Sequence, residues 1–139
     1  MKTKMFIRPI CLPPTRFERS EISLNRTVIA IGWGSTKSAD YSDVLQEASL
    51  RIANPFVCKR IFPQYFHING VQMCIGGGQE DTCSGDSGGP VMKLNKDLRY
   101  YVLAVTSFGI ENDCGVNDHP AVYTSVAHFN TWIRQSIKP

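Results

Sequence analysis

The chain has 139 residues, of which 42% are hydrophobic and 19% are charged. This composition predicts one globular domain that can bury a core, and it excludes a disordered or membrane-embedded chain. The fifteen Lys and Arg residues leave a net charge of only +3 and are scattered along the sequence, so we expect neither a nucleic-acid partner nor a membrane partner.

The chain opens with a proline-containing segment and continues as short apolar runs. Pro9, Pro13 and Pro14 predict an extended connector, because proline fixes φ and disfavours helix just before itself. Further along, apolar runs between turn residues predict strands at 28–31, 44–52, 100–106 and 121–124. This pattern is typical of an all-β barrel or sandwich.

The end of the chain has a different period. Val126, Phe129, Ile133 and Ile137 recur at helical spacing, with Trp132 beside them, which predicts an amphipathic C-terminal helix whose apolar face docks on the barrel. The predicted architecture is therefore a small β-barrel closed by one helix.

The cysteines indicate disulfides rather than a metal site. No CxxC pair and no Cys/His cluster has zinc spacing, so we expect no metal. Disulfides imply a secretory compartment, and an odd count implies one partner outside the chain. The sequon Asn25-Arg26-Thr27 is a possible glycosylation site that fits secretion. The first residues contain no apolar run long enough for a signal peptide, so we expect the natural N-terminus to lie upstream. The five cysteines are Cys11, Cys58, Cys74, Cys83 and Cys114.

The segment from Asp81 to Pro90, Asp-Thr-Cys-Ser-Gly-Asp-Ser-Gly-Gly-Pro, carries the strongest chemical signal. A tight surface turn would explain the last glycines and the proline, but not the whole string. A serine nucleophile needs an exposed hydroxyl on a constrained bend, with backbone N–H groups nearby to stabilise an oxyanion. Gly85 would let the backbone fold so that its own N–H and that of Ser87 point at one spot.

The segment 85–90 resembles the nucleophile loop of the trypsin/chymotrypsin family. Other matches follow in the family's order: Ile-Gly-Trp-Gly at 31–34, Ser-Phe-Gly at 107–109 and Pro-Ala-Val-Tyr-Thr at 120–124. The resemblance implies the second six-stranded Greek-key barrel of the chymotrypsin-like fold with its C-terminal helix, at residues 16–139. Residues 1–15 would be the linker between the barrels, and we expect the first barrel to be absent from this chain.

The resemblance also implies roles for individual residues. Ser87 is the nucleophile, and the N–H groups of Gly85 and Ser87 form the oxyanion hole. Asp86 pairs with a new N-terminal ammonium after activation cleavage. Two disulfides are implied, Cys58–Cys74 and Cys83–Cys114, while Cys11 would bridge to a propeptide, as in the clip-domain proteases of arthropods.

Asp81 lies six residues before Ser87, at the position of the charged base of the specificity pocket in trypsin-like members. A loop aspartate beside Glu80 is the simpler alternative, but the position relative to Cys83 and Ser87 favours the pocket role. Cleavage after Arg or Lys follows, with protein substrates, protein protease inhibitors as further partners, and no cofactor. Ala121 stands where glycine is usual, so its methyl group is expected to narrow the pocket and to shift the preference between Arg and Lys. The other pocket residues are Thr82, Ser107 and Gly109.

The general base of the family has no counterpart in this sequence. His67, His119 and His128 lack the Ala-Ala-His-Cys context, and we interpret each as a surface or core-edge residue. Without that base, Ser87 is an ordinary hydroxyl. We therefore expect a trypsin-like endopeptidase by family that is inactive as this chain alone. The alternative is a non-catalytic protease homologue that binds Arg or Lys without cutting.

Overall fold

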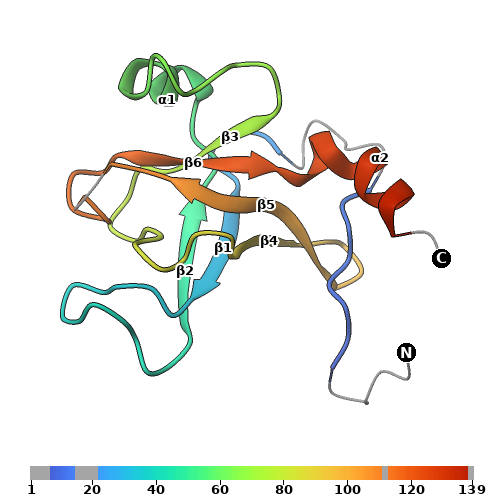
Figure 1. Ribbon diagram of the computed structural model, residues 1–139, viewed down its shortest axis with the longest axis horizontal. Coiled ribbons are helices and arrows are strands. Elements are labelled where there is room, and N and C mark those ends of the chain that lie inside the picture. The colour runs from blue at the N-terminus through green and yellow to red at the C-terminus, as the bar shows by residue number, and fades with distance from the viewer. Residues whose placement is uncertain (1–6, 15–21, 111–112, 138–139) are drawn as a thin grey trace.

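A computed structural model describes residues 7–14, 22–110 and 113–137. Six antiparallel strands form one sheet in the order β2-β1-β4-β5-β6-β3, with a short helix beside it and a second helix at the C-terminal end (Figure 1). The elements are β1 (Thr27–Gly32), β2 (Gln46–Arg51), α1 (Pro55–Ile61), β3 (Gln72–Gly76), β4 (Pro90–Leu94), β5 (Tyr100–Phe108), β6 (Pro120–Ser125) and α2 (Val126–Ser136).

The sheet curls until its two edge strands meet. Ile52, just after β2, forms an isolated antiparallel bridge with Ile75 of β3. The interior is apolar because alternate residues of each strand point inward. Val28 and Ala30 are 1% and 2% exposed, and Leu103 is fully buried. The predicted β fold is confirmed as a six-stranded, curled antiparallel sheet with a C-terminal helix, consistent with the second barrel of the chymotrypsin fold.

The strands predicted from apolar runs correspond to β1, β2, β5 and β6. The strands β3 and β4, which are five residues each, and the helix α1 were not predicted from the sequence. The helix α1 begins after Asn54, whose side chain accepts a hydrogen bond from the N–H of Phe56, and Pro55 occupies its first turn. Asn followed by Pro is a recognisable helix start, so the signal was present where only a strand end was inferred.

The predicted C-terminal helix is confirmed as α2. Ser125 caps it by accepting a hydrogen bond from the N–H of His128. Its buried residues are Val126 and Asn130, whereas Ile137 and Trp132 are each 66% exposed. The predicted apolar stripe is therefore wrong at Ile137, which ends the helix in solvent, and the buried Asn130 was not foreseen.

The connector is extended and docks on the barrel over residues 7–14. The backbone of Cys11 forms a parallel bridge with Tyr101. The N–H of Cys11 donates to the carbonyl of Tyr100, and the carbonyl of Cys11 accepts from the N–H of Val102. The carbonyl of Pro13 accepts from the side chains of Asn130 and Arg134 at 2.9 and 3.2 Å. The connector therefore links β5 to α2. Its remaining residues, and the expected boundary at residue 15, lie outside the described part of the chain.

No helix in the described segments is long and apolar enough to cross a membrane.

Candidate functional site

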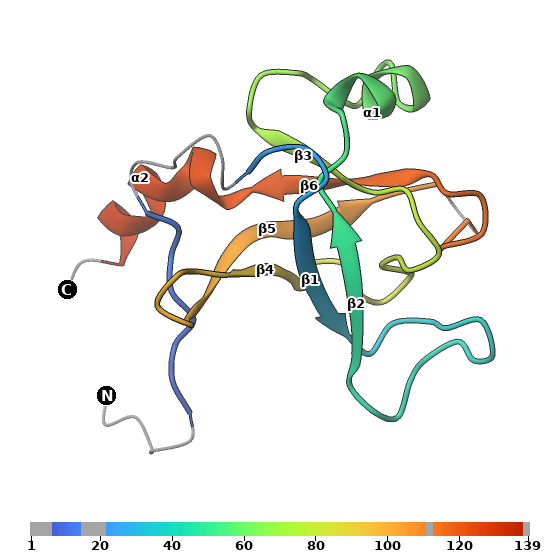
Figure 2. The same cartoon turned by 180° about the vertical axis from the view of Figure 1, so that it is seen from behind.

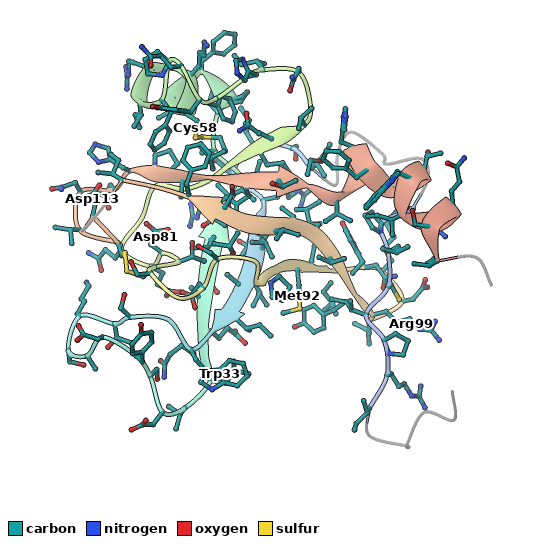
Figure 3. The ribbon with its side chains drawn as sticks, in the orientation of Figure 1. Trp33, Cys58, Asp81, Met92, Arg99 and Asp113 are labelled. Carbon is teal, nitrogen blue, oxygen red and sulfur yellow. A yellow bond between two sulfur atoms is a disulfide. The ribbon has the colours of Figure 1, made fainter. Side chains whose placement is uncertain are left out.

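Two cavities lie side by side at one end of the barrel, on either side of the segment from Asp81 to Asp86. The smaller has a volume of about 250 Å³ and the larger about 550 Å³. Asp81 and Asp113 lie at this end, and Arg99 lies at the opposite end (Figure 3). The long connection between β1 and β2 projects from the barrel (Figure 2), and its first residues line the larger cavity.

The smaller cavity brings together residues that are far apart in the sequence. The nucleophile loop contributes Ser87, the end of β5 contributes Ser107, and the start of β6 contributes Ala121. Asp81, Thr82 and Gly109 line the same cavity. The structure thus gathers Ser87 and all five residues that the sequence analysis assigned to a pocket.

The Asp81 carboxylate has only backbone partners. One oxygen accepts from the N–H of Thr82 at 2.8 Å and the other from the N–H of Gly115 at 3.4 Å. Burial raises the pKa of Asp81 to about 6, the two hydrogen bonds oppose this effect, and the nearby charge of Asp113 adds to it. Among the described residues no cationic side chain pairs with Asp81. The site therefore holds a partly desolvated acid that would gain from a cation.

Thr82 and Tyr123 form the hydrogen-bonded support next to Asp81. Their hydroxyl groups lie 2.8 Å apart, and Tyr123 is fully buried. Burial raises the pKa of Tyr123 above its ordinary value, so this phenol stays neutral and acts as a structural partner.

Ala121 narrows the smaller cavity opposite Gly109. A Cβ built on Gly109 would lie 3.2 Å from the Cβ of Ala121, which is tighter than an ordinary contact between methyl groups. The methyl of Ala121 therefore occupies space that a glycine would leave open, and Gly109 has little room for a side chain.

The serine loop is a constrained bend. Gly85 and Gly88 have φ values of +96° and +82°, a region that side chains disfavour. Ser87 is exposed. Within the described segments the N–H groups of Gly85 and Ser87 donate to no other protein group, whereas that of Gly88 donates to the carbonyl of Thr106. The loop therefore presents a hydroxyl and two available N–H donors.

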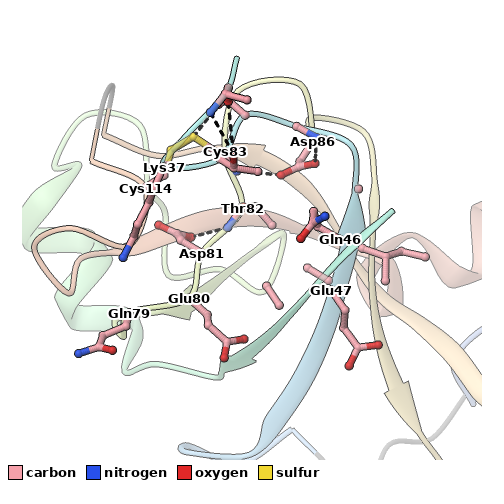
Figure 4. A pocket seen from close by; sticks show the side chains of 18 of the residues that line it. Lys37, Gln46, Glu47, Gln79, Glu80, Asp81, Thr82, Cys83, Asp86 and Cys114 are labelled. Atoms are coloured by element: carbon pink, nitrogen blue, oxygen red, sulfur yellow. Dashed lines mark hydrogen bonds between the residues drawn. A yellow bond between two sulfur atoms is a disulfide. The ribbon is translucent and has the colours of Figure 1, made fainter. Parts of the chain in front are cut away.

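Asp86 lies behind this loop and lines the larger cavity (Figure 4). Its carboxylate accepts from the N–H of Gly34 at 2.8 Å and from that of Cys83 at 2.9 Å. A Cβ at Gly32 or Gly34 would collide with this carboxylate, at 1.9 and 2.6 Å. The glycines of the Gly-Trp-Gly segment are therefore required by the close approach of Asp86.

The described segments contain two disulfides. Cys58–Cys74 joins α1 to β3, and Cys83–Cys114 joins the serine loop to the loop before β6. These are the two pairs that the resemblance implies. Cys11 is unpaired and half-buried. Among the described residues no cluster of His, Cys, Asp and Glu could hold a metal ion.

The pairing of His119 with Asp113 was not predicted from the sequence. Asp113 is 7% exposed, and its Oδ2 lies 2.6 Å from Nδ1 of His119, while its Oδ1 accepts from the side chain of Asn117. Both Asp113 and His119 line the smaller cavity. Neither lies in a recognisable motif, because their pairing depends on how the loop before β6 folds back.

The remaining predicted residues lie away from the cavities. His67 and His128 are exposed and line neither cavity. Asn25 is exposed in a left-handed turn with φ of 64°, just before β1. The sequon is thus on the surface, and its use remains a prediction.

Comparison with known proteins gives the family. The trypsin family model matches residues 1–133. The chain is 38% identical over 96% of its length to serine protease 7 of Drosophila melanogaster. It is 36% identical over 93% to the proclotting enzyme of Tachypleus tridentatus, and 38% identical over 93% to the CLIP domain-containing serine protease B8 of Anopheles gambiae. In each case it spans about a third of the relative's own length, 34%. The loop around Ser87, the cavity that contains Asp81 and these matches lead to one conclusion: the chain belongs to the trypsin family of serine proteases.

Proposed function

We propose that this chain is the second-barrel half of a trypsin-like endopeptidase that cleaves after Arg or Lys through an acyl-enzyme on Ser87. One observation carries the proposal: the carboxylate of Asp81, which has no cationic partner in the described part of the chain, and the exposed Ser87 line the same cavity of about 250 Å³. A substrate guanidinium or ammonium would supply the cation that Asp81 lacks. The scissile carbonyl would then lie near the mouth of the cavity, where Ser87 is exposed.

The two N–H groups of Gly85 and Ser87 are the oxyanion donors in this proposal. Their lack of other partners in the described segments supports the role, because a donor already engaged could not stabilise developing charge. Asp86 would pair with a cationic N-terminus entering the larger cavity. Until then the N–H groups of Gly34 and Cys83 balance its charge.

The setting of the whole protein is also part of the proposal. Residues 1–15 would be the linker to a first barrel that carries the base and its orienting aspartate. Cys11, half-buried and unpaired, would bridge to a propeptide. Two disulfides fit a secreted protein, and protein substrates and protein inhibitors would share the Asp81 cavity.

Binding of p-aminobenzamidine, an aromatic cation that becomes fluorescent in apolar sites, tests the pocket without requiring catalysis. We expect the chain to bind it and Asp81→Asn to weaken binding at least about tenfold, the loss of one charge-assisted hydrogen bond. Glu80→Gln is the matched control, because Glu80 is an exposed neighbour that bonds the N–H of Ser49 instead. Since the pKa of Asp81 is about 6, binding should weaken about tenfold from pH 7 to pH 5. Equal affinity of Asp81→Asn and the parent chain would refute the pocket assignment.

This chain alone should have no peptidase activity. Of its three histidines only His119 lines the cavity with Ser87, and its one side-chain hydrogen bond in the described segments is to Asp113, not to Ser87. Ser87 therefore lacks a base. Hydrolysis of an arginine ester by the purified chain should not change in Ser87→Ala. A Ser87-dependent rate would contradict this expectation.

A further inference from the structure

The smaller cavity has a second acidic residue that the proposed function does not use. Asp113 lies in the wall formed by the loop before β6, only 7% exposed. A buried carboxylate is costly unless it is hydrogen-bonded. Asp113 is supplied with two side-chain donors, His119 on Oδ2 and Asn117 on Oδ1.

These contacts close the loop on itself. Asn117 and His119 follow Asp113 by four and six residues, and the N–H of Val116 also donates to the carbonyl of Asp113 at 3.0 Å. The Cys83–Cys114 disulfide attaches the same loop to the segment that contains Asp81. We name the side chains of Asp113, Asn117 and His119 the loop clamp.

The loop held by the clamp reaches the pocket acid. The N–H of Gly115 donates to Oδ2 of Asp81 at 3.4 Å. Gly115 also packs closely on the neighbouring segment, since a Cβ there would lie 2.3 Å from the carbonyl oxygen of Gln79. Its φ of +64° is a second reason for glycine. The position of one of the two N–H groups that bind Asp81 is thus set by this loop.

We propose that Asp113 and His119 are positioning residues of the specificity pocket: their hydrogen bond holds the Gly115 N–H against Asp81 and so tunes the affinity of the pocket for a cationic side chain. The inference rests on the proposed role of Asp81. The clamp needs a donor on Nδ1 of His119. Both the neutral tautomer with a proton on Nδ1 and the imidazolium supply that donor, so either form of the ring makes the contact.

The electrostatic surroundings of Asp81 make the proposal specific. Among the described residues, the ionisable groups that interact with it are Asp113, whose charge raises the pKa of Asp81, and Tyr123, which is buried and neutral. The hydrogen bond from His119 is the main reason that the pKa of Asp113 lies below its ordinary value, so Asp113 stays charged. Loss of the Gly115 N–H raises the pKa of Asp81, whereas loss of the Asp113 charge lowers it. If removal of His119 acted only by letting Asp113 take up a proton, the pKa of Asp81 would fall. Positioning of the Gly115 N–H predicts instead that the pKa of Asp81 rises.

The test uses a matched pair at His119 in the 139-residue chain. His119→Ala removes the donor, and His119→Asn restores one, because the amide nitrogen of asparagine takes the place of Nδ1. The pKa of Asp81 is read by carbon NMR of its carboxyl group, together with the amide shift of Gly115. We expect a higher pKa for Asp81 in His119→Ala, a changed Gly115 shift, and near-parent values in His119→Asn.

Affinity for p-aminobenzamidine is the second measurement. The Gly115 hydrogen bond is long and therefore weak, so His119→Ala should weaken binding about threefold at pH 5, below the pKa of Asp81, with recovery as the pH rises to neutral. Asn117→Ala, a milder change, should shift the pKa of Asp81 in the same direction if His119→Ala fails to fold. An unchanged or lower pKa of Asp81 in both alanine variants would overturn the proposal. The NMR measurement needs no ligand. If the variants shift the pKa of Asp81 as expected but the parent chain binds no amidine, the proposed function is refuted while the positioning of Gly115 by the clamp is supported.

Discussion

Asp86 shows how one half-buried carboxylate dictates residues far away in the sequence. Its oxygens accept from the N–H groups of Gly34 and Cys83, and it leaves no space for a side chain at Gly32 or Gly34. The Gly-Trp-Gly segment was recognised from its resemblance to the family. The structure supplies the physical reason, which is the close approach of a carboxylate to two Cα atoms.

Gly34→Ala should therefore displace Asp86 and loosen the serine loop. The new methyl would lie 2.6 Å from the carboxyl carbon, so we expect a loss of about 1–3 kcal/mol in the free energy of unfolding. Urea denaturation measures it. Gly78→Ala is the matched control, because a Cβ there meets nothing within 4 Å. Similar stability of the two variants would show that Asp86 does not restrict this position.

The helices and the connector are held by polar contacts as well as by apolar packing. Asn130 of α2 is 4% exposed and donates to the carbonyl of Pro13 at 2.9 Å, and its own oxygen accepts from Nε of Arg134 at 2.9 Å. A helical pattern of apolar residues predicts that a helix exists, but not that its most buried central residue is polar. The partner of Asn130 lies 117 positions earlier, so no local pattern could reveal it.

Asn130→Ala should destabilise the chain by about 1–3 kcal/mol, because it removes a buried donor and leaves the Pro13 carbonyl with Arg134 alone. The connector should detach more easily from α2, which would make Cys11 react faster with a thiol reagent in the folded chain. Thr131→Ala, on the exposed face of α2, serves as the control. If both variants label Cys11 at the parent rate, the contact does not hold the connector.

The whole chain should lose stability as the pocket acid ionises. Asp81 has a folded pKa of about 6, above its ordinary value of 3.8, so the folded chain binds this proton more tightly than the unfolded chain. Its contribution to stability therefore falls as pH rises from about 4 to about 6, and stays low above that. The effect of Asp113 on stability has the opposite sign, because the pKa of Asp113 is lowered in the folded chain. Its contribution to stability is present above the ordinary pKa of 3.8 and is lost as the pH falls below that value.

Asp81→Asn isolates the first effect, because asparagine still accepts from the N–H of Thr82 and carries no charge. We expect its melting temperature to equal that of the parent chain near pH 4 and to exceed it at pH 7, with the gap opening between those values. Thermal unfolding followed by circular dichroism measures the difference. A gap that is constant with pH would mean that ionisation of Asp81 does not destabilise the fold. In the proposed function, this loss of stability is the cost of keeping a partly buried carboxylate that can bind a substrate cation.

The amino-acid sequence alone predicted the β fold, the C-terminal helix and a constrained bend around Ser87, because these signals are local. Strand periodicity, helical spacing and a glycine-rich bend are all readable within a few consecutive residues. The short elements α1, β3 and β4 escaped, since five to seven residues carry too little pattern. The closure of the barrel at Ile52 and Ile75, the contact of Asp86 with Gly34, and the pairing of Asp113 with His119 beside Asp81 depend on how distant or folded-back segments pack. The first two contacts join segments far apart in the chain, and the third depends on how one loop folds back, so all three became visible only in three dimensions.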